Sequence, residues 1–419
     1  MQTGRSIPPA SKPRLSIRII GWILIVVLII GFAEFLAFLF YVAKDGRWLS
    51  ARARLLEEPN KFIAEVINPS KCAYIDSLYP HPYLAFVHKR HGPCSLAWIN
   101  KTGLFGRDYP VEYDQTKFTI LLVGGSVAAQ FAQIYKGEPL FLEEELNRCY
   151  RPPHGDKFVV LNGADGAWKQ PQQAIIYLIY GGYVDAVVAL DGFNEYSLVF
   201  GGARLGIPAN NFVTANPLVM DSYATIAAAW LSKNLVSYVA TNSFLNKSYV
   251  VALVVHYLHG LLEAKASLGH SEYKQNFIDM FSLPSDWTSE QRYHFNIEQY
   301  RRYIRAIAAI ANVQHAKSAF FIQPVPAIGK VLTDQEKKAV GSLAYAANYQ
   351  RMTDDLLDLS KEGISIFSLL HVLDQEKETL YGDPIHFERN SMRGNQILAD
   401  VVARRLSDAW HLERTCGQE

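Results

Sequence analysis

The sequence has almost no net charge, few cysteines and no complete dinucleotide-binding motif. Its 419 residues hold 41 Lys and Arg against 40 Asp and Glu, a formal charge of +1. No overall positive field is available to attract nucleic acid phosphates, so we expect no nucleic acid partner. No complete GxGxxG occurs, and neither an internal repeat nor a low-complexity tract stands out. These absences argue against nucleotide-binding motifs and repeat architectures, and the composition is that of a globular protein.

The four cysteines, Cys72, Cys94, Cys149 and Cys416, all follow a long apolar run near the start of the chain. Their spacings resemble no zinc motif, so disulfides or free buried thiols are favoured over a metal site. Four cysteines allow three pairings, and the spacing does not choose among them. We expect the protein to need no metal and no cofactor.

The apolar run extends from Ile19 to Ala43 and is interrupted only by Glu34. About 25 residues at about 1.5 Å each exceed the thickness of the hydrocarbon layer, which predicts a transmembrane helix. A cleaved signal peptide is the alternative, but its apolar region is shorter and ends at a small-residue cleavage site. The segment Phe38–Lys44 does not clearly offer such a site.

Charges on the two sides of this run predict its orientation. The basic residues before it have no acidic neighbours, whereas the charges after it are mixed. The positive-inside tendency therefore predicts a cytoplasmic tail at residues 1–18, a single transmembrane helix at 19–43 and an extracytoplasmic remainder, periplasmic in a Gram-negative cell. Glu34 within the helix is expected to be protonated, to snorkel or to pair with another helix rather than to form a site. The basic residues are Arg5, Lys12, Arg14 and Arg18.

Beyond the anchor, short apolar runs alternate with helical patterns. Uniformly apolar runs are typical of strands buried on both faces. Their alternation with helices predicts an α/β fold with a parallel sheet covered on both sides. The expected strands are Phe118–Val123, Phe158–Leu161, Ala186–Leu190, Ala319–Ile322 and Ile364–Phe367. The expected helices run from Ser126 through Phe141–Leu146, from Pro171 through Tyr180, and over about Thr288–Ala311 and Asp334–Leu359.

The segments around this core differ in character. Residues 44–112 are rich in Pro, His and aromatic side chains and are expected to form a connecting segment that packs on the core. The core domain is expected to span residues 113–412, with a helical insertion at about 197–286. Within the insertion, the apolar run Tyr249–Leu262 is short of a full span, which favours a lid or membrane-facing surface over a second transmembrane helix.

Gly124, Gly125 and Ser126 directly follow the first expected strand. In open parallel sheets, sites form beyond the carboxyl ends of the strands. Glycines there permit a sharp turn and close backbone approach, while the N–H groups that open the next helix favour an anion. Ser126 is therefore a candidate nucleophile and a candidate oxyanion donor. An ordinary turn with Ser126 as a helix N-cap, or an anion-binding turn, is the alternative.

The sequence Asp383-Pro-Ile-His386 follows the last expected strand, at the same edge of the sheet. A histidine there can accept the serine proton and return it to the leaving group, while the carboxylate selects the imidazole tautomer. Asp383 and His386 are therefore candidates for the rest of a catalytic triad. A histidine that caps a following helix, expected at about Ser391–Leu406, would give the same pattern.

Two other strand ends carry candidate donors for a developing oxyanion. The second strand is followed by Gly166, which can present a backbone N–H, and the third by Asn194, which can present an amide. Together with the N–H of Ser126 they would supply a large part of a rate enhancement. Gly163 is an alternative to Gly166, and either Gly166 or Asn194 taken alone is also typical of a turn.

With these four motifs in order, residues 113–412 resemble the SGNH, or GDSL-like, hydrolase superfamily. The resemblance implies Ser126 as nucleophile, Asp383 and His386 as its partners, and Gly166 and Asn194 as oxyanion donors. It also implies a flavodoxin-like three-layer sandwich with a five-stranded parallel sheet. Two departures, Gly125 and Glu195 where the family usually has Asp, lie outside the triad. The matching segments are Gly124–Ser126, Asn162–Gly166, Gly192–Glu195 and Asp383–His386.

The resemblance and the anchor together predict a membrane-anchored, extracytoplasmic serine ester hydrolase that works through an acyl-enzyme. By analogy with anchored members of the superfamily, the expected substrate is an acyl group, such as acetyl, on an envelope polysaccharide or peptidoglycan. One alternative is an O-acetyltransferase of exopolysaccharide or cell-wall modification. Another is an inactive glycan-binding or assembly protein, in which Ser126 and His386 would not meet or Ser126 would resist fluorophosphonate labelling.

Overall fold

A computed structural model describes most of the chain, and its described residues fall into two compact units. One unit combines Met1–Lys61 with Met220–Gly269, and the other combines Phe62–Val219 with His270–Glu419. The described residues are 14–45, 48, 50–51, 77–91, 96, 98–134, 136–201, 203–205, 227, 231, 234–235, 238–239, 242–262, 264, 282–388 and 392–416.

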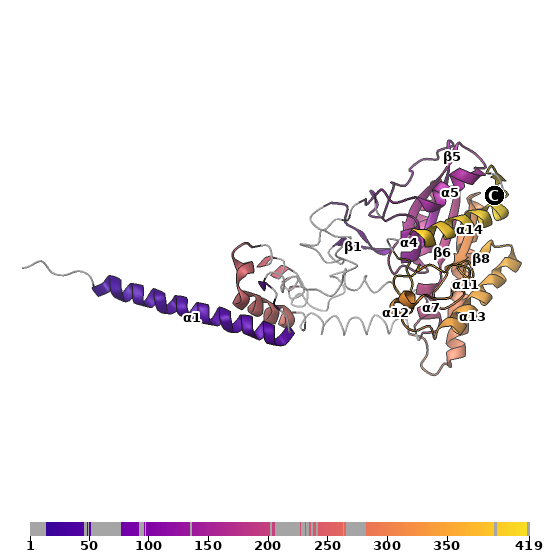
Figure 1. The fold of residues 1–419 in the computed structure, drawn as a ribbon. Helices are drawn as coiled ribbons and strands as arrows, with labels where there is room; N and C mark the ends of the chain where they lie inside the picture. The colour runs from indigo at the N-terminus through magenta and orange to yellow at the C-terminus, as the bar shows by residue number, and fades with distance from the viewer. Residues whose placement is uncertain are drawn as a thin grey trace, which may run out of the picture. The chain divides into compact units, whose positions relative to one another are not determined.

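The larger unit is built on a five-stranded, entirely parallel sheet (Figure 1). All five runs expected from the sequence are strands of this sheet. Its spatial order, β5-β3-β6-β7-β8, is the flavodoxin-like order, so the predicted fold class is confirmed. The strands are β3 (Lys117–Gly124), β5 (Lys157–Ala164), β6 (Ala186–Asp191), β7 (Lys317–Ile322) and β8 (Ile366–Ser368).

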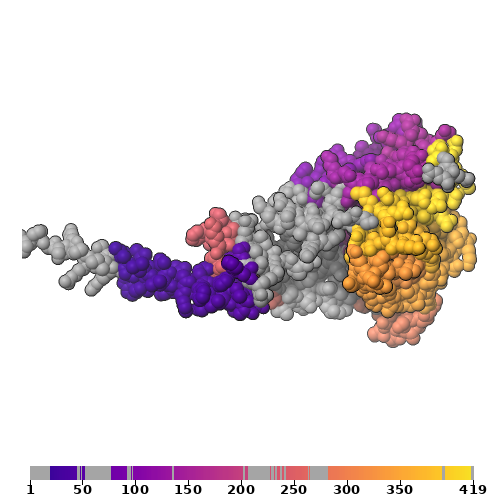
Figure 2. Space-filling model, in the orientation of Figure 1, coloured from indigo at the N-terminus to yellow at the C-terminus, as the bar shows by residue number. Residues whose placement is uncertain are grey.

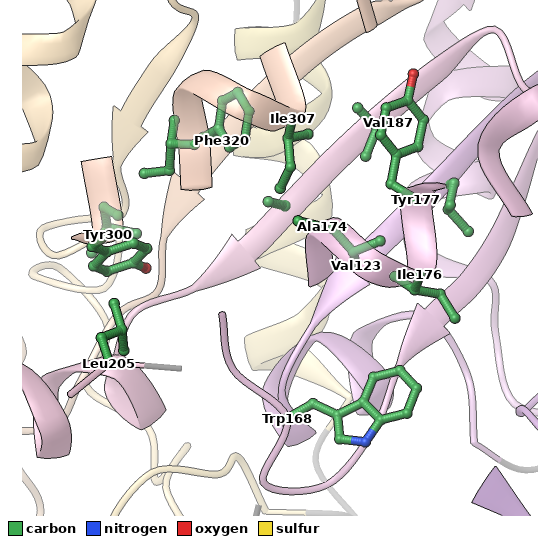
Figure 3. Packing of buried hydrophobic residues seen from close by; sticks show 14 of the residues in the cluster. Val123, Trp168, Ala174, Ile176, Tyr177, Val187, Leu205, Tyr300, Ile307 and Phe320 are labelled. Carbon is green, nitrogen blue, oxygen red and sulfur yellow. The ribbon is translucent and has the colours of Figure 1, made fainter. Parts of the chain in front are cut away.

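Alternate side chains of each strand enter two hydrophobic cores, one on each face of the sheet. In β3, Ile120 and Leu122 belong to one core, and Leu121 and Val123 belong to the other. Figure 3 shows the second core, where Val123, Val187 and Phe320 of the sheet lie near Ile176 and Ile307 of the covering helices. The first core is covered by α4 (Ser126–Phe131), α5 (Phe141–Cys149) and α14 (Arg393–Trp410). The second is covered by α6 (Gln172–Tyr180), α11 (Ser289–Val313) and α13 (Ala346–Leu357).

Two helices expected as continuous are each divided in the structure. The first ends with α4 and resumes at α5, because Gly137 has a φ of +93° and Pro139 lacks an N–H. The second is divided into α12 (Asp334–Ala339) and α13 by a turn at Gly341, which has a φ of +69°. The prediction of single helices is wrong at both places, because a residue with positive φ interrupts a helix.

Two smaller strand pairs tie peripheral segments to the larger unit. A hairpin of β1 (Leu78–His81) and β2 (Ala85–His88) sends Leu84 and Phe86 into the core that Figure 3 shows. The pair β4 (Tyr150–Arg151) and β9 (Glu413–Arg414) lies beside a disulfide between Cys149 and Cys416. Cys72 and Cys94 lie outside the described residues.

The smaller unit contains α1 (Arg14–Asp45) and the helix Tyr249–Leu262. Within α1, Ile19–Lys44 is long and apolar enough to cross a membrane, by length and composition. The second helix is apolar but shorter. Much of the expected insertion at 197–286 lies outside the described residues, so its boundaries stay a prediction.

Candidate active site

The site lies where the strand order reverses, at the carboxyl ends of β3 and β6. The chain leaves β3 for the sheet edge at β5 and then returns to β6 on the other side of β3. Ligands bind at such a reversal in open α/β sheets because the adjoining loops diverge there. Ser126 begins α4 directly after β3, and Asn194 lies in the first turn of α7 (Phe193–Val199) after β6.

The structure brings Ser126, His386 and Asp383 into one chain of hydrogen bonds. His386 Nε2 lies 2.7 Å from Ser126 Oγ, and His386 Nδ1 lies 2.8 Å from Asp383 Oδ2. When the ring proton is on Nδ1, that nitrogen donates to the carboxylate and Nε2 is left to accept the serine proton. This arrangement can deprotonate the Ser126 hydroxyl as a substrate is attacked.

Asp383 is held in its ionised form by its surroundings. Burial by itself would raise the pKa of Asp383, but the hydrogen bond and charge of His386 outweigh it and lower the pKa. The other carboxylate oxygen accepts the N–H groups of Ile385 at 2.9 Å and His386 at 2.7 Å, which act in the same direction. At neutral pH the carboxylate is therefore available to select the tautomer of His386.

The Asn194 amide lies against the turn that carries Ser126. Its Nδ2 donates to the carbonyl of Trp168 at 2.8 Å, which leaves its second N–H hydrogen for a ligand. A Cβ at Gly125 would lie 2.3 Å from that Nδ2, so glycine is required for this close approach. The N–H of Ser126, at the start of α4, has no acceptor within its own helix. The Ser126 N–H and the Asn194 amide, from two different segments, thus present two N–H donors beside the turn after β3.

Gly166, the third predicted donor, is differently engaged. Its N–H donates to Asp165 Oδ1 at 2.6 Å, so it has to be released before it can serve an oxyanion. Asp165 is itself buried and pairs with His88 of β2, whose Nε2 lies 3.0 Å from Asp165 Oδ2. The alternative donor, Gly163, lies inside β5 opposite Val123. The role of Gly166 stays a prediction.

A buried ion pair, which we did not expect from the sequence, anchors the loop that carries Asp383 and His386. Glu336 and Lys330 are joined at 2.8 Å, and both side chains are completely buried. The other oxygen of Glu336 accepts the N–H groups of Leu380 at 2.8 Å and Tyr381 at 3.1 Å. Glu336 therefore holds the first residues of the loop. An antiparallel bridge between Tyr381 and Phe387 joins the two ends of the loop.

Part of this arrangement had a sequence signal. Thr333 and Glu336 form a capping box at the start of α12, and their spacing is the recognised one. Nothing local, however, links Glu336 to Leu380, which lies 44 residues further along the chain. Only the packing of the loop against α12 makes Glu336 a support of the site.

Glu336→Gln is expected to lower the free energy of unfolding by about 3–5 kcal/mol, because Lys330 is left buried without a counter-charge. An amide has only one acceptor oxygen, so it cannot serve both Lys330 and the N–H groups of Leu380 and Tyr381, and kcat should fall with little change in KM as the loop that carries His386 is displaced. Chemical denaturation and ester kinetics measure the two effects.

A double variant separates stability from positioning. Lys330→Met with Glu336→Leu removes both charges, and we expect it to regain much of the stability while kcat stays low. If the double variant regained both the free energy of unfolding and kcat, the carboxylate of Glu336 would have no part in positioning the loop.

A second buried group of acids supports the Asn194 side of the site. Glu195 accepts the N–H groups of Gln170 and Gly192, each at 3.0 Å, and Asp191 accepts the hydroxyl of Tyr300 at 2.6 Å. Burial raises the pKa of Asp191 to about 6. Burial, with the nearby Asp191, raises the pKa of Glu195 to about 8. Glu195 therefore keeps its proton at neutral pH. Its hydrogen bond with the Gly192 N–H holds the start of α7 in place.

These raised pKa values predict that the protein loses stability as pH rises. Above the ordinary carboxyl pKa of about 4, the folded chain binds more protons than the unfolded chain, so the free energy of unfolding falls with pH until about 8. Asp191→Asn removes one buried carboxyl and the charge that raises the pKa of Glu195, so its Tm should depend less steeply on pH. Melting curves between about pH 5 and 9 measure this.

The exposed substitution Glu378→Gln is the control for this series, and its Tm should follow the wild type at every pH. A variant Asp191→Asn with an unchanged slope would contradict the assignment of the pH dependence to this pair.

Among the described residues, no group of three or more His, Cys, Asp or Glu side chains is arranged to hold a metal ion.

No family model and no curated protein matches the sequence. Solved structures that are similar to this chain include three with low TM-scores. A protein from Bacteroides fragilis NCTC 9343 designated an acylhydrolase has 6% identity and a TM-score of 0.35, with 71% of this chain and 90% of that one covered. The lipase/acylhydrolase from Enterococcus faecalis has 9% identity and a TM-score of 0.33, covering 71% and 99%. A protein from Parabacteroides merdae ATCC 43184 designated a GDSL-like lipase has 12% identity and a TM-score of 0.35, covering 72% and 100%. Such low similarity carries no inference about activity.

Proposed function

We propose that this chain is a membrane-anchored, extracytoplasmic serine ester hydrolase of the SGNH type. The observation that carries the proposal is the hydrogen-bond chain from Ser126 through His386 to Asp383 at the reversal of the strand order. In the proposed role, Ser126 is the nucleophile, His386 the general base and acid, and Asp383 the group that orients His386.

In the proposed reaction, Ser126 Oγ attacks the ester carbonyl while its proton passes to His386 Nε2. The negative charge that develops on the carbonyl oxygen is stabilised by the Ser126 N–H and the Asn194 amide, with Gly166 joining once its N–H leaves Asp165. The tetrahedral intermediate expels the alcohol, which takes the proton from His386. Water then attacks the acyl-enzyme while His386 takes its proton, the bond between the acyl group and Ser126 Oγ breaks, His386 returns the proton to Ser126 Oγ, and the acid leaves.

Two features support the proposed location. The helix Ile19–Lys44 is long and apolar enough to serve as an uncleaved anchor, and the basic residues before it favour a cytoplasmic N-terminus. The disulfide between Cys149 and Cys416 suits an oxidising compartment outside the cytoplasm. An enzyme held there is beside the envelope glycans, so we propose their O-acyl groups, acetyl foremost, as the substrate class.

The proposal is tested with the full-length protein in detergent. A fluorophosphonate probe is expected to label the wild type, and peptide mapping should locate the adduct at Ser126. Acetate released from O-acetylated glycan then tests the substrate class, and acetyl transferred to an added glycan acceptor would instead identify an O-acetyltransferase. A chain that neither reacts with the probe nor turns over aryl esters would be a binding or assembly protein on this fold.

A further inference from the structure

The helix Tyr249–Leu262 carries apolar side chains on the face that its own unit leaves exposed. Val254, Tyr257, Leu258 and Leu261 are all exposed, and Tyr257 is 67% exposed. Their spacing of i, i+3, i+4 and i+7 places them on one side of the helix. In a helix that meets water, this face would be polar. An apolar exposed face therefore calls for an apolar covering.

The opposite face of this helix packs on α1. Ala252 and Val255 are buried in a cluster with Tyr41 of α1, and the Tyr41 hydroxyl lies 2.8 Å from His256 Nδ1. The rings of Phe38 and Tyr249 also meet edge to face, with centroids 5.3 Å apart. In Figures 1 and 2 this segment, in salmon, lies against the C-terminal half of indigo α1. The helix thus packs on α1, whose own apolar side chains, such as Leu28 and Phe35, are also exposed.

Glu34, the one acidic residue inside the apolar run, joins the two helices. One oxygen of its carboxylate accepts the N–H of Tyr249 at 2.7 Å and that of Val250 at 3.3 Å, and the other accepts the Ser248 hydroxyl. These N–H groups open the helix Tyr249–Leu262 and have no acceptor within it. A carboxylate suits this end of a helix, because the helix dipole is positive there. Glu34 is therefore satisfied by a helix N-terminus rather than by another charged side chain.

The contacts also set the direction and depth of the second helix. Glu34 meets Tyr249 and Tyr41 meets His256, so seven residues along α1 correspond to seven along the other helix. The two helices consequently run side by side in the same direction. Glu34 precedes Lys44, the end of the candidate span, by ten residues, or about 15 Å of helix. The second helix therefore begins level with Glu34, inside the candidate span, and runs toward the end of the span at Lys44.

The second helix is too short, and its start too polar, to cross the bilayer. Its length is about 21 Å, against about 30 Å for the hydrocarbon layer. Lys247 lies just before it and is exposed, and a lysine at this depth has to extend its four-carbon side chain to bring the ammonium toward the headgroups. The helix is therefore suited to one leaflet.

We propose that the helix Tyr249–Leu262 is embedded in the leaflet from which α1 emerges, with its exposed apolar face on lipid acyl chains and Glu34 as its anchor. This inference rests on α1 lying in a membrane, as the proposed function assumes. It is independent of the hydrolase chemistry. The lipid contact makes this helix, part of the expected insertion at about 197–286, a membrane-bound element of the protein.

Site-directed fluorescence quenching in full-length protein reconstituted into phosphatidylcholine vesicles tests this proposal. Single cysteines replace Leu258 on the exposed face, Leu28 in the middle of α1 and Val313, an exposed residue at the end of α11, and each is labelled with bimane. The parent protein measures the background from native cysteines. We expect shallow doxyl lipid to quench the label at Leu258→Cys, and aqueous iodide to quench it about threefold less than the label at Val313→Cys.

The outcomes separate the two proposals. Lipid quenching at Leu28→Cys with iodide quenching at Leu258→Cys equal to that at Val313→Cys would overturn the leaflet proposal and leave the anchor standing. A label at Leu28→Cys that no doxyl lipid quenches would overturn the anchor itself. Shielding of Leu258→Cys from iodide without lipid quenching would mean that protein, such as a second copy of the chain, covers this face, and it would also overturn the proposal.

The role of Glu34 is tested in the Leu258→Cys protein. Glu34→Leu removes the acceptors for the helix N-terminus and is expected to bring lipid quenching at Leu258→Cys down toward that of Val313→Cys. Glu34→Gln keeps one acceptor oxygen and should retain the quenching. Equal quenching in these two backgrounds would exclude Glu34 as the anchor. Tyr257→Cys repeats the measurement should Leu258→Cys fail to fold.

Discussion

Ser126→Ala is expected to lower kcat/KM for a short-chain aryl ester on the order of 10⁴- to 10⁶-fold. The substitution removes the only atom that the proposed mechanism joins to the acyl group. The oxyanion donors remain, so a small rate above that in water is expected to persist. Steady-state hydrolysis by the purified full-length proteins measures the ratio, and the same variant should no longer react with the fluorophosphonate probe.

Folding is not expected to change in this variant, because the Ser126 hydroxyl interacts with His386 at the edge of the site rather than within a core. The melting temperature therefore serves as an internal check. Ser342→Ala is a matched substitution at an exposed serine and should retain full activity. Equal turnover by Ser126→Ala and the wild type would remove Ser126 from the proposed mechanism.

Asp383→Asn is expected to lower kcat by about 10⁴-fold with little change in KM. Its amide oxygen can still accept the N–H groups of Ile385 and His386, so the loop should keep its shape. Its NH₂ group would then face His386 Nδ1 as a donor, and His386 would carry its proton on Nε2. In that tautomer Nε2 cannot accept the proton of Ser126. Kinetics on the same ester, together with the rate of fluorophosphonate labelling, measure the loss.

The chain offers a matched control for this substitution. His371 and Asp374 form another pair three residues apart, with Nδ1 and Oδ2 separated by 3.1 Å, and the His371 side chain is exposed. Asp374→Asn alters the same kind of contact away from Ser126 and should leave kcat unchanged. If the two variants lost activity equally, the loss could not be assigned to the tautomer of His386.

The sheet was predictable because its signal is local. Each strand is buried on both faces, so each appears as an uninterrupted apolar run, such as Phe118–Val123 or Ala186–Leu190. The breaks that divide two of the expected helices are also local, at Gly137 and Gly341, whose positive φ the residue type permits but does not require. The expectation that Ser126 and His386 would meet followed from topology, since parallel strands bring their carboxyl ends to one edge.

The supporting contacts of the site had no comparable signal. Glu336 holds Leu380, and Gly125 admits the Asn194 amide, through contacts between segments distant in the sequence. The N–H of Gly166 can be identified as a candidate from its position after β5, but whether it is free depends on where Asp165 points. Such choices depend on side-chain packing, which neither residue type nor spacing specifies.

The sequence by itself determined the α/β architecture, the apolar helix near the N-terminus and the identity of the residues that could form a triad. It did so because burial on both faces of a strand, and the length of an apolar helix, are properties of contiguous residues. The tertiary structure decided that Ser126, His386 and Asp383 are within hydrogen-bond distance and that Glu34 meets the helix at Tyr249. These contacts join residues separated by as many as 260 positions, and only the packed chain brings such residues together.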